Sequence, residues 1–146
     1  MISLHKELTK ILNEEKSLLE ILFKTVSEER DAIVGLNSVE LEKILREKEQ
    51  TLIKLSLWEE ERVKLLAKNG LENTTLSEIL EMNNESPELI QLKELYYSMK
   101  TLLNAISEIQ RINEQLIDRS IMHIGTAIKF LETFGINAKQ SLSREA

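Results

Sequence analysis

The sequence predicts an all-α fold: an antiparallel bundle of three long helices with coiled-coil-like packing, and a short helix in the connector between the second and third. Two observations predict this class. The 146 residues contain only 4 Gly and 1 Pro, too few for the turns of a β-sandwich or barrel. Leu, Glu and Lys, which favour helices, are abundant, whereas Val and the aromatic residues, which favour strands, are few. The length fits a single helical domain, residues 1–146.

The first long helix is predicted over residues 3–34. Its apolar residues recur at steps of three and four, which places them on one face of a helix. Gly35 follows directly and is predicted to end the helix. The apolar face consists of Leu4, Leu8, Ile11, Leu12, Leu18, Leu19, Leu22 and Val26.

The second long helix is predicted over residues 38–69. Asn37 and Glu40 have the spacing of a capping box, with Asn in place of Ser or Thr. Strictly alternating steps of four and three residues then predict a coiled-coil seam, the line of positions that faces a partner helix. Three polar members of this seam are expected to set its register. The seam consists of Leu41, Leu45, Lys48, Leu52, Leu55, Glu59, Arg62 and Leu66.

The connector is acidic and rich in Asn. A short helix is predicted over residues 75–82, because Thr75 and Glu78 again have capping-box spacing. The third long helix is predicted over residues 87–133, since Ser86 suits the cap and Pro87 suits the first helical position. The tail that follows, residues 134–146, is expected to be flexible.

The third helix is expected to extend beyond its neighbours. It would be about 69 Å long, about 20 Å longer than either of the first two. An apolar seam runs along it, and a second row widens the seam enough to contact two partner helices. Apolar residues beyond the ends of the neighbours would form an exposed surface of the kind that marks a binding site. The second row consists of Leu95, Leu102, Ile109 and Leu116.

The end of the third helix is therefore the predicted binding region. Gly125 lies inside it and costs about 1 kcal/mol relative to Ala. This Gly is either tolerated for close helix approach or marks an adaptable segment that engages a helix of another protein. Polar residues at seam positions favour register and partner choice over stability. The candidate binding residues are Gln110, Asn113, Leu116, Ile117, Ser120, Ile121, Ile124, Ile128 and Leu131.

Other function classes find little support in the sequence. The chain has no Cys, its two His residues are far apart, and it has no Gly-rich phosphate loop. We therefore expect no catalytic residue, no metal and no cofactor. The net charge of −6 disfavours nucleic acid as a partner. No apolar run is long enough to insert into a membrane, and Glu7 interrupts any signal peptide, so a cytoplasmic location is expected.

Three stretches of the chain resemble FlgN-type flagellar export chaperones. The second helix, from Leu41 to Gly70, has the family's Lys-centred start, paired leucines, an arginine and a closing glycine. Residues 110–117 resemble the family's motif of paired Asn followed by paired Leu, with Gln in the first Asn position. Phe134 and the following Gly resemble a Tyr-Gly pair of some members, with Phe in place of Tyr. The resemblance covers residues 4–135.

The resemblance implies a chaperone of type III export. Such a chaperone binds the hook–filament junction proteins FlgK and FlgL through its C-terminal part and keeps them soluble and export-competent. It also implies that Phe134 contacts the export gate protein FlhA. The residues alone leave an alternative open, a structural coiled-coil protein that homo-oligomerises through the same seam, and a weak homodimer is compatible with either. An adaptor that regulates another enzyme is a third interpretation.

Overall fold

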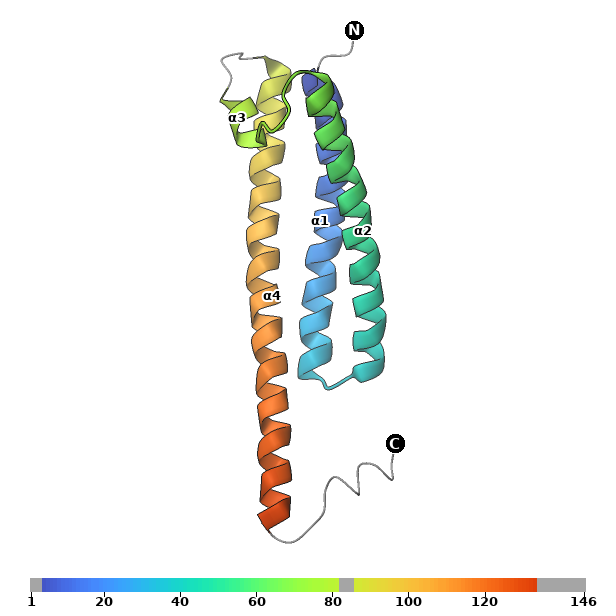
Figure 1. Ribbon diagram of the computed structural model, residues 1–146, viewed down its shortest axis with the longest axis vertical. Helices are drawn as coiled ribbons and strands as arrows, with labels where there is room; N and C mark the ends of the chain where they lie inside the picture. Colours follow the sequence, from blue (N-terminus) through green and yellow to red (C-terminus); the bar gives the residue numbers. More distant parts are fainter. Residues whose placement is uncertain (1–3, 82–85, 134–146) are drawn as a thin grey trace.

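The computed structural model describes residues 4–81 and 86–133, and the predicted tail lies outside them. Consecutive long helices alternate in direction, so α1 and α4 run parallel to each other and α2 runs opposite to both (Figure 1). The predicted class, three long helices packed antiparallel with a short helix between the second and third, is confirmed. The helices are α1 (Leu4–Val34), α2 (Ser38–Lys68), α3 (Leu76–Leu80) and α4 (Pro87–Thr133), the last being continuous through Gly125.

Three helices begin at the predicted caps. The Oδ1 atom of Asn37 accepts a hydrogen bond from the backbone N–H of Glu40 at 3.1 Å. Thr75 and Glu78 form a complete capping box ahead of α3. The Oγ atom of Ser86 accepts from the N–H of the third residue of α4 at 3.2 Å. These bonds satisfy N–H groups that a first helical turn leaves free, which is why the starts were predictable from sequence.

The helix α1 ends at Val34, as predicted, but its left-handed cap lies one residue later than Gly35. Leu36, rather than Gly35, occupies the left-handed position, with φ of 52°. The N–H of Asn37 then reaches back to the carbonyl of Ala32 at 3.0 Å, as in a Schellman motif. At the end of α2 the equivalent position is held by Gly70, with φ of 73°. A leucine in this conformation costs about 1 kcal/mol or more, because its Cβ crowds the backbone.

The helix α1 is the centre of the arrangement. It packs against α2 on one side and α4 on the other, and the short α3 packs on the start of α4. No Cα atom of α2 lies within 8 Å of a Cα atom of α4. The backbones of α2 and α4 therefore stay apart, and a groove floored by α1 lies between them.

The core is a single apolar cluster along α1 and α4. The predicted apolar face of α1 is buried or half-buried throughout, and so is the second row of α4. Two positions of the α1 face were missed because they are charged: Glu15 and Glu29 are both buried. The cluster of buried residues consists of Leu8, Leu12, Leu19, Leu22, Val26, Leu66, Ile79, Leu92, Leu95, Met99 and Ile106.

The predicted seam of α2 is right at five positions and wrong at three. Leu45 and Leu52 are nearly half exposed, and Glu59 is exposed as well. The residues that face inward in their place each lie one position earlier in the chain: Ile44, Thr51 and Trp58. A shift of one residue turns the facing row by about 100°. Both rows of α2 mix apolar and polar residues, so packing against α1 decided which of them faces it.

Candidate functional site

A first groove, here called the lower groove, lies where α4 passes the turn between α1 and α2. Its volume is about 250 Å³. None of the side chains that line it is charged, so it suits an apolar ligand surface. It is lined by Ala32, Ile33, Leu36, Asn37, Ser38, Leu41, Ile117, Ser120, Ile121 and Ile124.

Four of the nine predicted binding residues meet in this groove. Ile117, Ser120, Ile121 and Ile124 form its α4 wall. The hydroxyl of Ser120 donates to a carbonyl of its own helix at 2.9 Å, so it presents no free donor to a ligand. The remaining surface of this wall is aliphatic. The α4 wall can therefore cover an apolar side chain but offers little hydrogen bonding.

The wall continues into the distal segment of α4, which we define as residues 117–133. Figure 1 shows this segment extending past the turn between α1 and α2. Ile121 is 63% exposed and Ile124 is 60% exposed. Ile128 and Leu131 lie one heptad further along the same face and are half-buried. The predicted apolar surface beyond the ends of the neighbouring helices is thus present.

The opposite wall comes from the turn, which sequence reasoning missed. Leu36 is 82% exposed, and Val34 and Val39 on either side of it are exposed as well. A strained residue is retained where the surrounding structure or function requires it. Leu36 is strained yet contributes little to the core, so its side chain is a candidate binding residue. An apolar residue directly after Gly35 was the sequence signal that could have identified it.

Two other predicted residues, the buried Asn113 and the half-buried Gln110, make contacts between the chain's own helices. Asn113 is 0% exposed, and its Nδ2 donates to Glu29 at 2.7 Å and to the carbonyl of Val26 at 3.0 Å. The ammonium of Lys48 donates to Glu29 at 3.2 Å and also to Gln110. Glu29, Lys48, Gln110 and Asn113, here called the polar cluster, thus join α1, α2 and α4. Asn113 and Gln110 fix the register of the chain's own helices, and we leave them out of the surface proposed below.

One polar atom of the polar cluster makes no hydrogen bond. The Oδ1 atom of Asn113 is buried without a hydrogen-bond partner. A buried acceptor of this kind costs about 1–3 kcal/mol. Leu116, the next predicted residue along the row, is half-buried beside the cluster. The last predicted residue, Phe134, lies outside the described residues.

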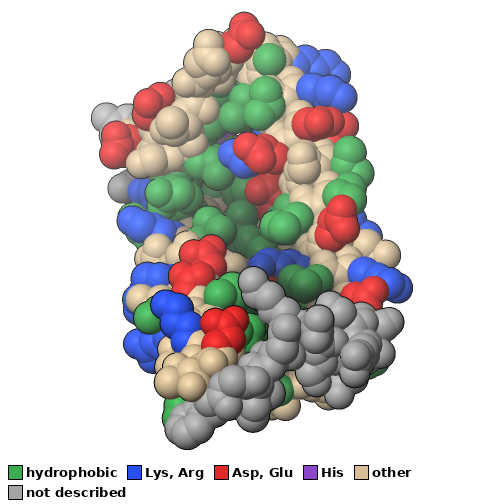
Figure 2. Space-filling model, turned by 60° about the horizontal axis from the view of Figure 1, so that its bottom comes forward, with side chains coloured by type: hydrophobic (Ala, Val, Ile, Leu, Met, Phe, Trp, Pro, Cys, Tyr) green, Lys and Arg blue, Asp and Glu red, His purple; other side chains and the backbone are tan. Residues whose placement is uncertain are grey.

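A second groove, here called the upper groove, lies between α2 and α4 near α3. Its volume is about 390 Å³. Figure 2 shows hydrophobic side chains gathered in a hollow between two ridges of the surface, with charged side chains among them. The groove is lined by Glu15 and Leu19 of α1, Leu55, Glu59 and Arg62 of α2, Leu76 of α3, and Tyr96, Met99, Lys100 and Leu103 of α4.

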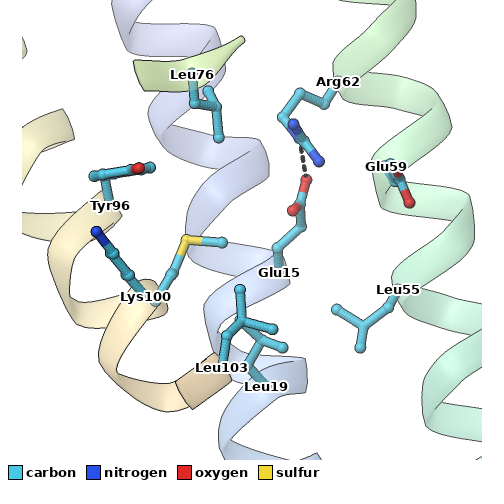
Figure 3. A pocket seen from close by; sticks show the side chains of 10 residues that line it. Glu15, Leu19, Leu55, Glu59, Arg62, Leu76, Tyr96, Lys100 and Leu103 are labelled. Atoms are coloured by element: carbon cyan, nitrogen blue, oxygen red, sulfur yellow. Dashed lines mark hydrogen bonds and ion pairs between the residues drawn. The ribbon is translucent and has the colours of Figure 1, made fainter. Parts of the chain in front are cut away.

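An ion pair lies at the floor of the upper groove. The Nε atom of Arg62 donates to Glu15 at 3.0 Å, and both side chains are mostly buried (Figure 3). Burial raises the pKa of the Glu15 carboxyl above its ordinary value, while the Arg62 charge lowers it and the charge of Glu59 raises it further. Desolvation is the largest of these effects on the pKa. A buried ion pair with a large desolvation cost adds little net stability, so this pair mainly orients α2 on α1.

The described residues show no site for catalysis by a metal. Within residues 4–81 and 86–133, no three His, Asp or Glu side chains gather where they could hold an ion. Over the same ranges, no helix combines the length and hydropathy that crossing a membrane requires. Among the hollows found on the described surface, the two grooves are those lined mainly by apolar residues.

Comparison with known proteins agrees with this geometry. The model of the FlgN protein family matches residues 1–134, most of the chain. Searches of curated proteins and of solved structures gave no match. FlgN proteins are flagellar export chaperones and not enzymes, which accords with two open grooves and a helical scaffold. The chain therefore belongs to the FlgN protein family of flagellar export chaperones.

Proposed function

We propose that this chain is a cytoplasmic chaperone that holds the hook–filament junction proteins FlgK and FlgL export-competent before type III secretion. The observation that carries the proposal is the distal segment of α4. Its apolar face extends past the ends of α1 and α2, and Ile121 and Ile124 on it are mostly exposed. Family membership supports a flagellar client but leaves its identity to experiment.

The proposed mechanism is helix-on-helix recognition. A client helix lays its apolar stripe against Ile117, Ile121 and Ile124, and one of its side chains fills the lower groove. Further along, Ile128 and Leu131 extend the same face. Covering the stripe removes apolar surface from water on both partners, which keeps the client soluble until export. The uncharged lining of the groove supports this mode of recognition, because a charged client residue would be desolvated there without a partner.

The turn between α1 and α2 is included in the proposed surface. Leu36 lies across the lower groove from Ile121 and Ile124. Its left-handed backbone conformation would be relieved by Gly or Asn, yet the chain carries Leu. A client helix seated between the turn and α4 would bury this side chain. Contact with Leu36 gives a reason for the strain that packing within the chain does not.

A double substitution tests the proposal. Ile121→Asp combined with Ile124→Asp places two charges on the proposed surface and is expected to abolish client capture in a pull-down. Helicity measured by circular dichroism should stay unchanged, because both side chains are exposed in the free chain. The expected loss of affinity is at least 100-fold, since burying an unpaired charge costs several kcal/mol.

A matched control separates the surface from helix stability. Met122→Asp combined with Thr126→Asp introduces the same charges in the same turns, on the opposite side of α4. Both residues are exposed, and client capture is expected to persist. Capture that survives the first pair of substitutions would place the client site elsewhere on the chain.

We further propose that Phe134 contacts the export gate protein FlhA. The support is its position directly after α4, where some family members have a Tyr-Gly pair. Phe134→Ala is expected to reduce secretion of the client without weakening client binding. Loss of both activities would contradict a separate gate contact.

Sedimentation tests the alternative of a homo-oligomeric scaffold. The chaperone proposal predicts a monomer or weak dimer that forms a tight complex when FlgK or FlgL is added. A tetramer whose mass does not depend on concentration would instead favour a scaffold built through the α4 face.

A further inference from the structure

We propose that the upper groove is a second client-binding groove. In this proposal one amphipathic client helix runs from the lower groove into the upper groove and becomes a fourth helix beside α1, α2 and α4. It carries an apolar stripe flanked by basic residues toward α2 and acidic residues toward α4. The inference rests on the proposed function, since the occupant is the same client.

The first reason is the separation of α2 and α4. Helices that pack together lie 8–10 Å apart. Here α1 packs with each of the other two, while no Cα of α2 approaches a Cα of α4 within 8 Å. The groove between them is floored by Glu15 and Leu19 of α1. This arrangement leaves a groove on one side of α1, and a helix packed over it would complete a four-helix bundle.

The second reason is the chemistry of the two walls. Figure 3 shows Tyr96 and Lys100 on the α4 side of the groove and Leu55 and Glu59 on the α2 side. Within the described part of the chain, neither Lys100 nor Glu59 makes an ion pair. An occupant with basic side chains toward Glu59 and acidic side chains toward Lys100 would neutralise both, while Leu55 and its aliphatic neighbours cover its apolar stripe.

The third reason is continuity along α4. Tyr96 and Leu103 of the upper groove share one row, at steps of seven residues, with Ile117 and Ile124 of the lower groove. A helix lying along this row from residue 96 to residue 124 would be about 42 Å long, or about 28 residues. The two grooves therefore form one track along α4.

The residue midway along this row is Gln110, which accepts a hydrogen bond from Lys48 of α2. This bond bridges the track between the two grooves. A client helix that occupies both grooves passes over the bridge or displaces the Lys48 ammonium, which keeps its second partner, Glu29, in either case. The hydrogen bond between Lys48 and Gln110 thus separates the two grooves but does not prevent one helix from occupying both.

Site-specific fluorescence tests the inference, because the chain contains no Cys and an introduced one is unique. Three variants carry an environment-sensitive label: Leu103→Cys in the upper groove, Ile124→Cys in the lower groove, and Gln115→Cys at an exposed position on the opposite side of α4 as the control. Each labelled full-length chain is titrated with purified FlgK and, separately, with purified FlgL. The labels at 103 and 124 are expected to shift with one shared Kd, and the label at 115 is expected to stay unchanged.

The other outcomes overturn the inference in distinguishable ways. A response at 124 alone confines the client to the lower groove and leaves the proposed function intact. If neither groove label responds although the client is captured, both the inference and the proposed client surface are wrong. A response at 103 to rising concentration of the chain alone would assign the groove to a second copy.

A charge reversal tests the predicted flanks of the client helix. Glu59→Lys is expected to weaken client binding by about two- to fivefold, the range of a single exposed ion pair. Glu60→Lys changes the net charge identically on the neighbouring, outward-facing position and is expected to leave the Kd unchanged. Equal weakening by both variants would show that overall charge, and not the groove, affects affinity.

Discussion

The two grooves along α4 are built differently. The upper groove lies between two helices that both pack around α1, and the Glu15–Arg62 ion pair holds one of its walls in place. The lower groove has a single turn as one wall and the uncovered distal segment of α4 as the other. The upper groove is therefore a preformed part of the fold, whereas the lower groove can adapt to a ligand. A chaperone that accepts more than one client benefits from having one part that is fixed and one that adjusts.

The largest effect is expected where the upper groove is held together. Arg62→Leu leaves the buried Glu15 carboxylate without its partner and should lower the free energy of unfolding by about 3 kcal/mol in a urea titration. Replacing both residues with Leu should restore stability to within about 1 kcal/mol of the parent chain. The exposed pair of Arg46 and Glu42 is the control, since Arg46→Leu is expected to change stability by less than about 0.5 kcal/mol.

If Arg62→Leu proved as mild as Arg46→Leu, the upper groove would not be held by its ion pair. The contrast between a fixed and an adaptable groove would then fail.

The pH dependence of stability should also originate in the upper groove. Burial raises the pKa of Glu15 in the folded chain. Between the unfolded value of 4.5 and the raised folded value, the folded state binds more protons, so this residue makes the free energy of unfolding fall as pH rises. Glu15→Gln should remove this fall in urea titrations performed from pH 4 to 7.

The surface residue Glu108 is the matched control for this measurement. Its hydrogen bond from Arg111 lowers its pKa, so its contribution has the opposite sign and rises with pH. Glu108→Gln should therefore leave the fall caused by Glu15 in place. An unchanged pH profile in Glu15→Gln would show that burial of this carboxyl has no thermodynamic consequence.

A smaller, local effect on stability is expected in the distal segment of α4. A Cβ added at Gly125 would meet no atom within 4 Å, so Gly125→Ala should stabilise the distal segment by about 1 kcal/mol. Amide hydrogen exchange near residue 125 should slow by about fivefold, while the midpoint of global unfolding stays the same. Gly70→Ala should destabilise the chain, because Gly70 has φ of 73°.

If Gly125→Ala instead raised the midpoint of global unfolding, the distal segment would be part of the cooperative fold. It would then not be the adaptable wall described above.

The smallest effect on stability is expected at the turn. Leu36→Asn suits the left-handed conformation, so thermal stability should remain equal or rise by less than about 1 kcal/mol. Client affinity should nevertheless fall about fivefold, because an apolar contact worth about 1 kcal/mol is lost. Equal stability with unchanged affinity would remove Leu36 from the lower groove's binding surface.

The site was predictable where it follows the period of α4. Ile117, Ile121 and Ile124 share a helical face, and the greater length of α4 indicated that this face lacks neighbours. The pattern around Asn113 was ambiguous, because a polar residue at a seam position can contact either its own chain or a partner. Here it bonds Glu29, a charged residue whose burial no apolar pattern indicates. Long-range pairs of this kind appear only when the helices are placed together.

The sequence by itself determined the helices, their caps and the excess length of α4. These depend on interactions within a few residues, such as the Thr75–Glu78 capping box, and on the spacing of apolar residues. Only the tertiary structure decided which row of α2 faces α1, that α2 and α4 stay apart, and that Leu36 adopts the left-handed conformation. The physical reason is that α2 has two rows, about 100° apart, that both mix apolar and polar residues, and contacts between distant segments select one of them.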